Sequence, residues 1–222
     1  MSDFGPIWQA AEARVGGPDA LADRLTRPKS EAELRAVADD RYLSLMTRRI
    51  FQAGLKHSLV DAKWPVFEEA FFGFDPGRCA ALRDEDLDAR LADKRLIRHG
   101  GKMVAIRHNA TALLAVAGIE GGMGAWLAAW PSSRIVELWD ELGRRFSNLG
   151  GNSAPYFLRM AGKDTFLLTD SVVRALIHWG ALEGPPKTKA ERANVQELFN
   201  RWQAATGRPF CQLSQTLALS TE

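Results

Sequence analysis

The sequence predicts a nearly all-helical protein, and three observations support that fold class. Alanine and leucine dominate the composition, β-branched residues are sparse, and apolar residues recur at intervals of three and four through most of the length. The chain has 222 residues, of which 46% are hydrophobic, so it is long enough to bury a substantial core. Disordered and collagen-like proteins are thereby excluded. Because no internal repeat divides the chain, residues 1–222 are expected to form one compact unit.

Capping residues, prolines and glycines predict where the individual helices begin and end. Asp19 follows Pro18 and is expected to cap a short helix that ends before Pro28. Ser30 and Glu33 have the spacing of a capping box, so a helix should begin directly after Ser30. Apolar stripes at helical spacing place further helices at residues 40–53, 64–72, 84–91 and 101–117, after Ser132, after Asn152, and at residues 189–206 and 210–220.

The charge balance excludes a strongly basic, histone-like nucleic-acid binder. The 29 Lys and Arg and the 27 Asp and Glu leave a formal net charge of +2, so affinity for a polyanion must come from local clustering. Two cysteines, Cys79 and Cys211, are too few for a disulfide framework or a structural zinc site. The sequence has neither a secretory apolar region nor a run of about 18 apolar residues, so we expect a protein of the reducing cytoplasm without a membrane partner.

The stretch from Arg144 to Leu176 carries the most chemical information. One helix is expected to end there at a glycine turn and a second amphipathic helix to follow, which aims several backbone N–H groups in one direction. Glycine allows a phosphate to approach closely, and Arg144 and Arg145 would add positive charge. From these residues alone, a contact to a phosphate backbone and an ordinary helix–helix turn are equally favoured.

Residues 146–154, Phe-Ser-Asn-Leu-Gly-Gly-Asn-Ser-Ala, resemble without a gap the helix-hairpin-helix of the base-excision DNA glycosylase superfamily. In the same register, the catalytic aspartate of that superfamily falls on Asp170. Asn148 replaces the first glycine of the hairpin, which is tolerable because asparagine adopts left-handed conformations more readily than other non-glycine residues. Asn152 stands where bifunctional members carry a Schiff-base lysine, so the resemblance implies a monofunctional enzyme that uses water as its nucleophile.

The middle of the chain is similar to the 3-methyladenine DNA glycosylase I family, with its motifs in the same order and at matching spacing. They are QAGL at residues 52–55, FEEAFFGFDP at 67–76, DED at 84–86 and IRHGGK at 97–102, followed by AI at 105–106 and NA at 109–110. The two resemblances together cover residues 40–180 and imply an all-helical, two-lobed helix-hairpin-helix glycosylase architecture. One lobe would be a middle bundle, residues 40–165, with the hairpin at about 144–160, and the other would combine residues 1–39 with 166–222.

The resemblance also implies a base pocket, and this sequence departs from the family there. Arg49 stands where the family has a glutamate that contacts the flipped base, and His57 replaces a tryptophan that stacks on it. Arg49 would repel cationic N3-methyladenine, so either the pocket binds another lesion or other residues supply these contacts. Tyr42, Trp64 and Trp8 are candidates for stacking or for a wedge into the DNA, and Tyr42 is assigned to the pocket.

Asp170 has two competing interpretations. Its own context, after Thr169 and before an apolar helical run, favours an N-cap. The superfamily register instead implies a carboxylate that stabilises positive charge on the sugar and orients water, and the two roles are compatible. The residues expected to contact DNA are Leu149, Gly150, Gly151, Asn152, Ser153, Arg145 and Lys102, of which Lys102 is also interpretable as an exposed, solvated charge.

The resemblances imply a monofunctional DNA glycosylase that hydrolyses the N-glycosidic bond of a damaged, alkylated purine such as 3-methyladenine in base excision repair. Members of that family hold a zinc ion with Cys and His from both ends of the chain, and those ligands do not occur here, so neither a metal nor a cofactor is expected. The partner would be double-stranded DNA with damaged bases, bound by a cytoplasmic monomer that associates with the nucleoid. A non-catalytic helix-hairpin-helix DNA-binding or lesion-sensing protein is the alternative. An all-helical protein-interaction module would leave the ordered motifs unexplained.

Overall fold

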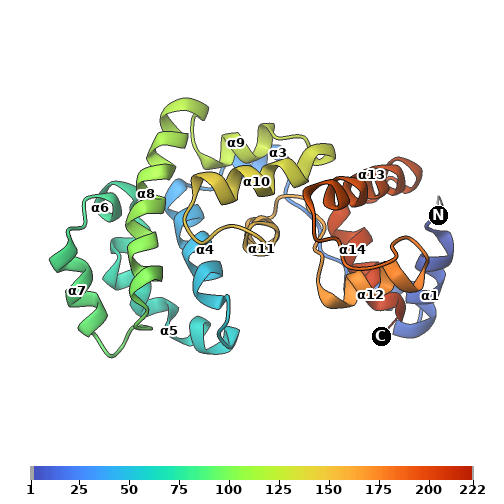
Figure 1. The fold of residues 1–222 in the computed structure, drawn as a ribbon, viewed down its shortest axis with the longest axis horizontal. Coiled ribbons are helices and arrows are strands. Elements are labelled where there is room, and N and C mark those ends of the chain that lie inside the picture. Colours follow the sequence, from blue (N-terminus) through green and yellow to red (C-terminus); the bar gives the residue numbers. More distant parts are fainter. Residues whose placement is uncertain (1–2, 222) are drawn as a thin grey trace. The chain divides into compact units, whose positions relative to one another are not determined.

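The computed structural model describes residues 3–221, and these residues form fourteen α-helices and two short 3-10 segments without a strand (Figure 1). The prediction of an all-helical protein is therefore confirmed. The chain divides into two compact units. Unit 1 consists of Met1–Lys29, Pro131–Glu137 and Gly162–Glu222, and unit 2 consists of Ser30–Trp130 and Leu138–Ala161.

Unit 2 is organised around helix α4, which packs against α5, α8, α9 and α11. Its apolar stripe, with Leu43, Met46 and Ile50, is buried because these residues recur on one face of the helix. The elements of this unit are α3 (Glu31–Arg35), α4 (Asp39–Gln52), α5 (His57–Ala70), η1 (Phe72–Phe74), α6 (Pro76–Ala80), α7 (Asp84–Ala92), α8 (Gly100–Glu120), α9 (Met123–Ala129) and α11 (Ser153–Ala161).

Stacked aromatic rings hold the end of α5 to η1. Trp64 stacks on Phe67 and on Phe74, at centroid distances of 5.2 and 5.4 Å, and Phe71 continues the stack on both sides. All four rings are buried, and such pairs stabilise a fold beyond the area that they bury.

Unit 1 joins segments from both ends of the chain around α14. Helices α1, α12 and α13 all pack on α14, and α1 lies beside α14 although they are far apart in sequence (Figure 1). Its elements are α1 (Gly5–Val15), α2 (Pro18–Ala22), η2 (Ser132–Arg134), α12 (Asp170–His178), α13 (Lys189–Thr206) and α14 (Phe210–Thr221). Helix α10 (Ile135–Arg145) begins in unit 1 and continues in unit 2.

Most predicted boundaries agree with the structure, and the exceptions have physical causes. The capping box at Ser30 and Glu33 is present, with both reciprocal hydrogen bonds. Gly17 rather than Asp19 is the N-cap of α2, because Pro18 already occupies the first helical position. Helix α5 begins at His57 and contains Pro65 in its interior, since burial of the neighbouring apolar residues outweighs the hydrogen bond that proline lacks.

Helices α1 and α6 were not anticipated from the sequence. Each begins at a Gly-Pro or Asp-Pro pair, which the sequence pattern alone does not distinguish from a turn. Among residues 3–221, no single helix is long and apolar enough to cross a bilayer; α8 and α9 reach that length only as a pair, with a bend of 62° between them.

Candidate functional site

The segment between α10 and α11 forms a tight hairpin. Phe146 and Leu149 are buried and anchor it, while the glycines between them and α11 remain exposed. Asn148 has a φ of 59° and Gly151 a φ of 57°, so both adopt the left-handed conformation. The interpretation of Asn148 as a left-handed substitute for glycine is confirmed.

One side chain from α8 holds this hairpin in place. Asn109 is fully buried, and its Nδ2 donates to the carbonyl oxygen of Ser147 at 3.1 Å while its Oδ1 accepts from the backbone N–H of Ser147 at 2.7 Å. A buried amide with both ends satisfied fixes the position of the backbone that it binds. The Asn109-Ala110 motif in the sequence does not by itself indicate this role, because Ser147 is 38 positions away.

The exposed part of the hairpin presents unused backbone donors. Within residues 3–221, the N–H groups of Gly150, Gly151 and Asn152 donate to no protein acceptor. Gly150 has open space where a side chain would lie, whereas a Cβ at Gly143 would come within 3.1 Å of the Gly150 Cα. Donors at the start of a helix, in front of a glycine that permits close approach, form an anion site.

The predicted DNA contacts are therefore partly brought together. Gly150, Gly151, Asn152 and Ser153 lie consecutively at this turn and at the start of α11. Leu149 belongs to the same turn, but its side chain is buried, so only its backbone is available.

The arginines before the hairpin contribute less charge than their sequence suggests. Arg145 donates to Glu141 at 3.1 Å, and Arg144 also pairs with Glu141. The Arg145 guanidinium in addition lies 5.0 Å from the centroid of the Trp126 ring. The hydrogen bond from Arg144, aided by that from Arg145, lowers the pKa of the Glu141 carboxyl, so these three side chains together carry a net charge of +1.

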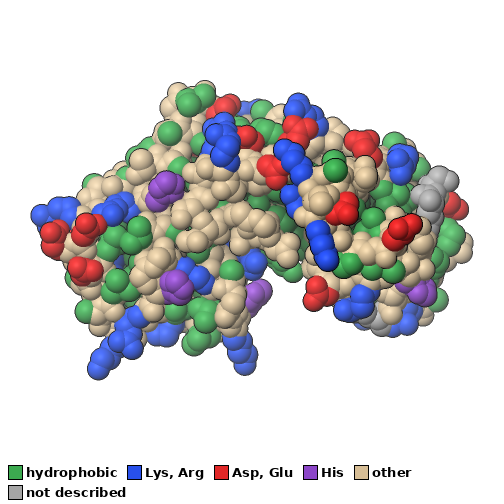
Figure 2. Space-filling model, viewed as in Figure 1, with side chains coloured by type: hydrophobic (Ala, Val, Ile, Leu, Met, Phe, Trp, Pro, Cys, Tyr) green, Lys and Arg blue, Asp and Glu red, His purple; other side chains and the backbone are tan. Residues whose placement is uncertain are grey.

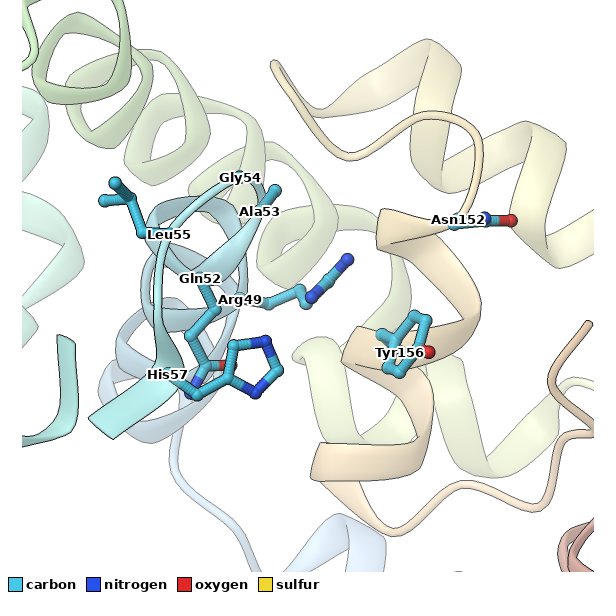
Figure 3. Close-up of a pocket in the computed structure, with 8 residues that line it drawn as sticks. All are labelled: Arg49, Gln52, Ala53, Gly54, Leu55, His57, Asn152 and Tyr156. Carbon is cyan, nitrogen blue, oxygen red and sulfur yellow. The ribbon is translucent and has the colours of Figure 1, made fainter. Parts of the chain in front are cut away.

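A pocket of about 350 Å³ lies next to the hairpin, between α4, the start of α5 and α11 (Figure 3). Its volume is typical of sites for small molecules. The lining residues are Arg49, Gln52, Ala53, Gly54, Leu55, His57, Asn152 and Tyr156. The structure thus brings together Arg49 and His57, the two pocket residues expected from the family, and adds Asn152 of the hairpin.

Arg49 is the dominant charge in this pocket. Its side chain extends from α4 towards α11, and its guanidinium lies 4.3 Å from the centroid of the Tyr156 ring (Figure 3). Arg49 is only 8% exposed, and it forms neither a hydrogen bond nor an ion pair with any residue from 3 to 221. Burial lowers the pKa of this guanidinium, but an arginine remains protonated at neutral pH.

The nearby polar side chains are paired with one another. Asp61 accepts from Arg48 Nε at 2.9 Å and from Gln52 Nε2 at 3.0 Å, which orients Gln52 at the edge of the pocket. The hydrogen bond from Arg48 is the main reason why the pKa of Asp61 lies below its usual range. His57 is exposed at the first position of α5.

Lys102 has a structural role that its sequence context does not indicate. Its ammonium donates to the carbonyl oxygen of Ala53 at 2.7 Å and, more weakly, to that of Phe51 at 3.4 Å. It therefore binds the C-terminal end of α4, where a cation is favourable. Half-burial, with a contribution from Arg49, lowers its pKa, and the interpretation of Lys102 as an exposed solvated charge is wrong.

The three aromatic residues considered for stacking or for a wedge, Tyr42, Trp64 and Trp8, pack against other residues of the protein. Tyr42 is fully buried, donates its hydroxyl to the Leu34 carbonyl oxygen at 2.8 Å and does not line the pocket, so its assignment there is wrong. Trp64 donates to Ser44 within the aromatic stack of unit 2, which also excludes it as a wedge. In unit 1, one face of the Trp8 ring is covered by the Arg208 guanidinium at 3.4 Å.

Asp170 is the first residue of α12 in unit 1, and its side chain is exposed. The N-cap is Thr169, whose hydroxyl accepts from the backbone N–H of Val172 at 3.2 Å, so the interpretation of Asp170 as the cap is wrong. Asp170 forms no side-chain hydrogen bond or ion pair with the described residues. Its carboxylate is thus available for chemistry.

The residues present do not fit a zinc ion. Cys79 and Cys211 are buried in different units and donate to the carbonyl oxygens of Phe71 and Thr26, respectively. Burial raises the pKa of the Cys79 thiol to about 12. Among residues 3–221, no group of three or more His, Cys, Asp or Glu side chains is placed to hold a metal.

Comparison with known sequences identifies relatives of the pocket-bearing part of the chain. A profile of the family described as methyladenine glycosylase matches residues 34–144. A DNA-3-methyladenine glycosylase of Haemophilus influenzae is 43% identical over 65 residues, which are 29% of this chain and 35% of the relative. DNA-3-methyladenine glycosylase 1 of Escherichia coli is 41% identical over 63 residues, 28% of this chain and 34% of the relative. The matches thus span about a third of the length of these curated relatives.

Comparison with solved structures extends the likeness to most of the chain. The 3-methyladenine DNA glycosylase I of Staphylococcus aureus superposes with a TM-score of 0.53 at 19% identity, over 73% of this chain and 95% of the other. An 8-oxoguanine glycosylase/lyase of Methanocaldococcus jannaschii gives a TM-score of 0.54 at 13% identity, over 95% of this chain and 94% of the other. At these identities, the likenesses show a shared fold.

Proposed function

The chain belongs to the methyladenine glycosylase family, whose profile matches half of its 222 residues, and from this membership we propose that it is a monofunctional DNA glycosylase. It would hydrolyse the N-glycosidic bond of a damaged purine in double-stranded DNA during base excision repair. The family resemblance of the QAGL and IRHGGK motifs is confirmed. The names of the relatives make 3-methyladenine the first base to test.

The observation that carries this proposal is the adjacency of the hairpin and the pocket in unit 2. The N–H groups of Gly150, Gly151 and Asn152 would bind phosphate oxygens of the DNA backbone, because these residues are exposed and the three N–H groups have no acceptor within the described part of the chain. Asn152 also lines the pocket, so the same turn would bind the DNA backbone next to the site of the extrahelical base. A base must leave the stack, at a cost of a few kcal/mol, before a pocket can hold it.

The proposed reaction is a hydrolysis at C1′ of the damaged nucleotide. The C1′–N bond breaks and its electron pair leaves with the base, while positive charge develops on the sugar. The Asp170 carboxylate would stabilise that charge and accept a proton from the water whose oxygen bonds to C1′. The Asp170 carboxylate is exposed and has no hydrogen-bond or ion-pair partner among residues 3–221, which supports this role.

A monofunctional reaction follows from the residue at the position of the Schiff-base lysine. Asn152 occupies it, and an amide has no nucleophilic amine with which to form an imine. We therefore expect release of the free base with an intact abasic strand. We also expect the protein to act as a cytoplasmic monomer on nucleoid DNA, which sedimentation and imaging of the tagged protein would test.

The test is mass spectrometry of bases released from methylated DNA by the purified wild type and by Asp170→Asn. Release of a methylpurine by the wild type, its loss in Asp170→Asn, and unchanged DNA binding of that variant would support the proposal. Thr169→Ala is the matched control, because it removes the true N-cap and leaves the carboxylate in place. Lesion-dependent binding without release of any base would instead support a non-catalytic lesion sensor.

A further inference from the structure

The pocket of unit 2 contains donors and a positive charge but no acid. Its eight lining residues, all of them described, include one guanidinium, one imidazole, one phenol and two amides, and none is a carboxylate. The nearby carboxylate of Asp61 is bonded to Arg48 and Gln52, which leaves it no role as a counter-ion for a ligand.

Arg49 is the residue of the pocket whose hydrogen-bond donors are not all paired with acceptors among residues 3–221. Its side chain is more than nine-tenths buried, and its buried Nε has no acceptor among the described residues. One face of the guanidinium is packed on Tyr156, so the N–H groups at its edge remain to be bonded. Buried donors are almost always paired in folded proteins, and an arginine edge matches two neighbouring acceptor atoms.

A second positive charge near Arg49 also disfavours a cationic ligand. Lys102 is half-buried near Arg49, and its ammonium is held by backbone carbonyls rather than by an acid. A cationic ligand would be repelled by this positive charge, because no carboxylate lines the pocket to offset it. A neutral ligand with acceptors would bond the arginine edge without that cost.

Resting on the proposed function, we propose that the base held by this pocket is a neutral 6-oxopurine of the hypoxanthine type rather than a cationic N3-alkylated adenine. The O6 and N7 atoms of such a base are neighbouring acceptors that the Arg49 edge fits in the bidentate manner known for arginine and guanine. Adenine presents an N6 donor in place of O6, and that donor would face the donors of Arg49. Leu55, His57 and Tyr156 add apolar and aromatic groups to the lining of the pocket, which suit a purine ring better than a tetrahedral anion.

Free bases test this reading separately from catalysis. Hypoxanthine and adenine are both neutral and differ in the group at position 6 and in the proton on N1, so NMR titration of each into the 222-residue protein measures the preference of the pocket without a difference in charge. We expect hypoxanthine to bind at least about tenfold more tightly than adenine, and Arg49→Gln to abolish that preference. Arg49→Lys, which keeps the charge but not the planar edge, should retain only part of it.

The matched control is Arg107→Gln. It removes one positive charge from the same unit, at a residue paired with the exposed Asp84 and absent from the pocket. The ratio of affinities for hypoxanthine and adenine in Arg107→Gln should stay within about twofold of the wild-type ratio. Equal binding of the two bases, binding of neither, or a preference that survives in Arg49→Gln would overturn the proposal.

Base release then separates this inference from the proposed function. The wild type is given a duplex with one deoxyinosine and, in parallel, methylated DNA, and released bases are identified by mass spectrometry. Faster release of hypoxanthine than of 3-methyladenine supports both proposals. Release of 3-methyladenine alone leaves the glycosylase standing and overturns the inference. Selective binding of free hypoxanthine without release of any base would support the proposed preference of the pocket and contradict the proposed glycosylase activity.

Discussion

Asn109 and Ser147 form a reciprocal pair in which one buried side-chain amide both donates to and accepts from the backbone of a single residue, 38 positions away in sequence. The distances of 3.1 and 2.7 Å are those of good hydrogen bonds. This pair ties the hairpin to α8, the helix that also carries Lys102. The position of the candidate phosphate site is therefore set by a residue that has no contact with DNA in the proposed function.

Asn109→Ala should loosen the hairpin as well as destabilise the protein. The substitution leaves the N–H and C=O of Ser147 without their partner, which costs about 2 kcal/mol or more in the free energy of unfolding. Affinity for DNA should fall even at temperatures where the variant remains folded. Urea unfolding and fluorescence anisotropy with a DNA duplex measure the two effects. His108→Ala, at the exposed neighbouring position, should change neither, and wild-type affinity in folded Asn109→Ala would contradict the role assigned here.

Gly150→Ala should weaken DNA binding without affecting the fold. A Cβ at Gly150 meets no protein atom within 4 Å, so the free energy of unfolding should change by less than about 0.5 kcal/mol. The same methyl group would occupy the space through which a phosphate reaches the N–H groups, and affinity should drop about tenfold. In contrast, Gly151→Ala should cost about 1 kcal/mol of stability because its φ is +57°. Unchanged affinity in Gly150→Ala would exclude this face of the turn as a phosphate site.

Lys102→Met should act on stability and on the pocket rather than on phosphate binding. It removes the ammonium that bonds the carbonyl oxygens at the end of α4, at a cost of about 1 kcal/mol. The dependence of DNA affinity on salt concentration should keep its slope, since no phosphate contact is lost. A slope reduced by about one unit would instead assign Lys102 to the DNA backbone, as the sequence resemblance implied.

Acidification should destabilise the protein from about pH 4.5 downwards. Arg144 and Arg145 hold the pKa of the Glu141 carboxyl below its usual range, as Arg48 and Gln52 do for Asp61. A depressed pKa in the folded state means that the stabilisation is complete above the unfolded pKa and is lost as the pH falls through the folded value. Thermal unfolding between pH 6 and 3 should show this decline, and Glu141→Gln should make it shallower. Glu120→Gln, at an exposed position, should leave the slope unchanged.

The sequence was sufficient for features that depend on neighbours along the chain. The capping box at Ser30, the helix at Lys189–Thr206 and the left-handed Asn148 all follow from local rules that tertiary packing did not override. Asp170 shows where local rules fall short, because Thr169 and Asp170 are both good capping residues and only the backbone geometry selects Thr169.

The contacts that define the site depend on distances that no sequence pattern contains. Lys102 reaches the carbonyl of Ala53 across 49 positions, and nothing in its own helix distinguishes it from a solvated lysine. Tyr42 lies about two helical turns before Arg49 on α4, where its side chain is fully buried and its hydroxyl donates to the carbonyl oxygen of Leu34, so it does not reach the pocket. Arg49 lines the pocket, and only the structure shows that its guanidinium contacts the ring of Tyr156 and forms no hydrogen bond with any residue from 3 to 221.

The way in which the two units share the chain sets an order for their folding during synthesis. Every segment of unit 2 has left the ribosome soon after Ala161 is translated, so its core, with the hairpin and the pocket, is able to close while the rest is still being made. Helix α1 is synthesised before unit 2 but packs on α14, which is synthesised after it, so the buried face of α1 is covered only once α14 has been made. In a nascent chain stalled after unit 2, we therefore expect α1 to expose its apolar side chains to chaperones while the core of unit 2 is able to form.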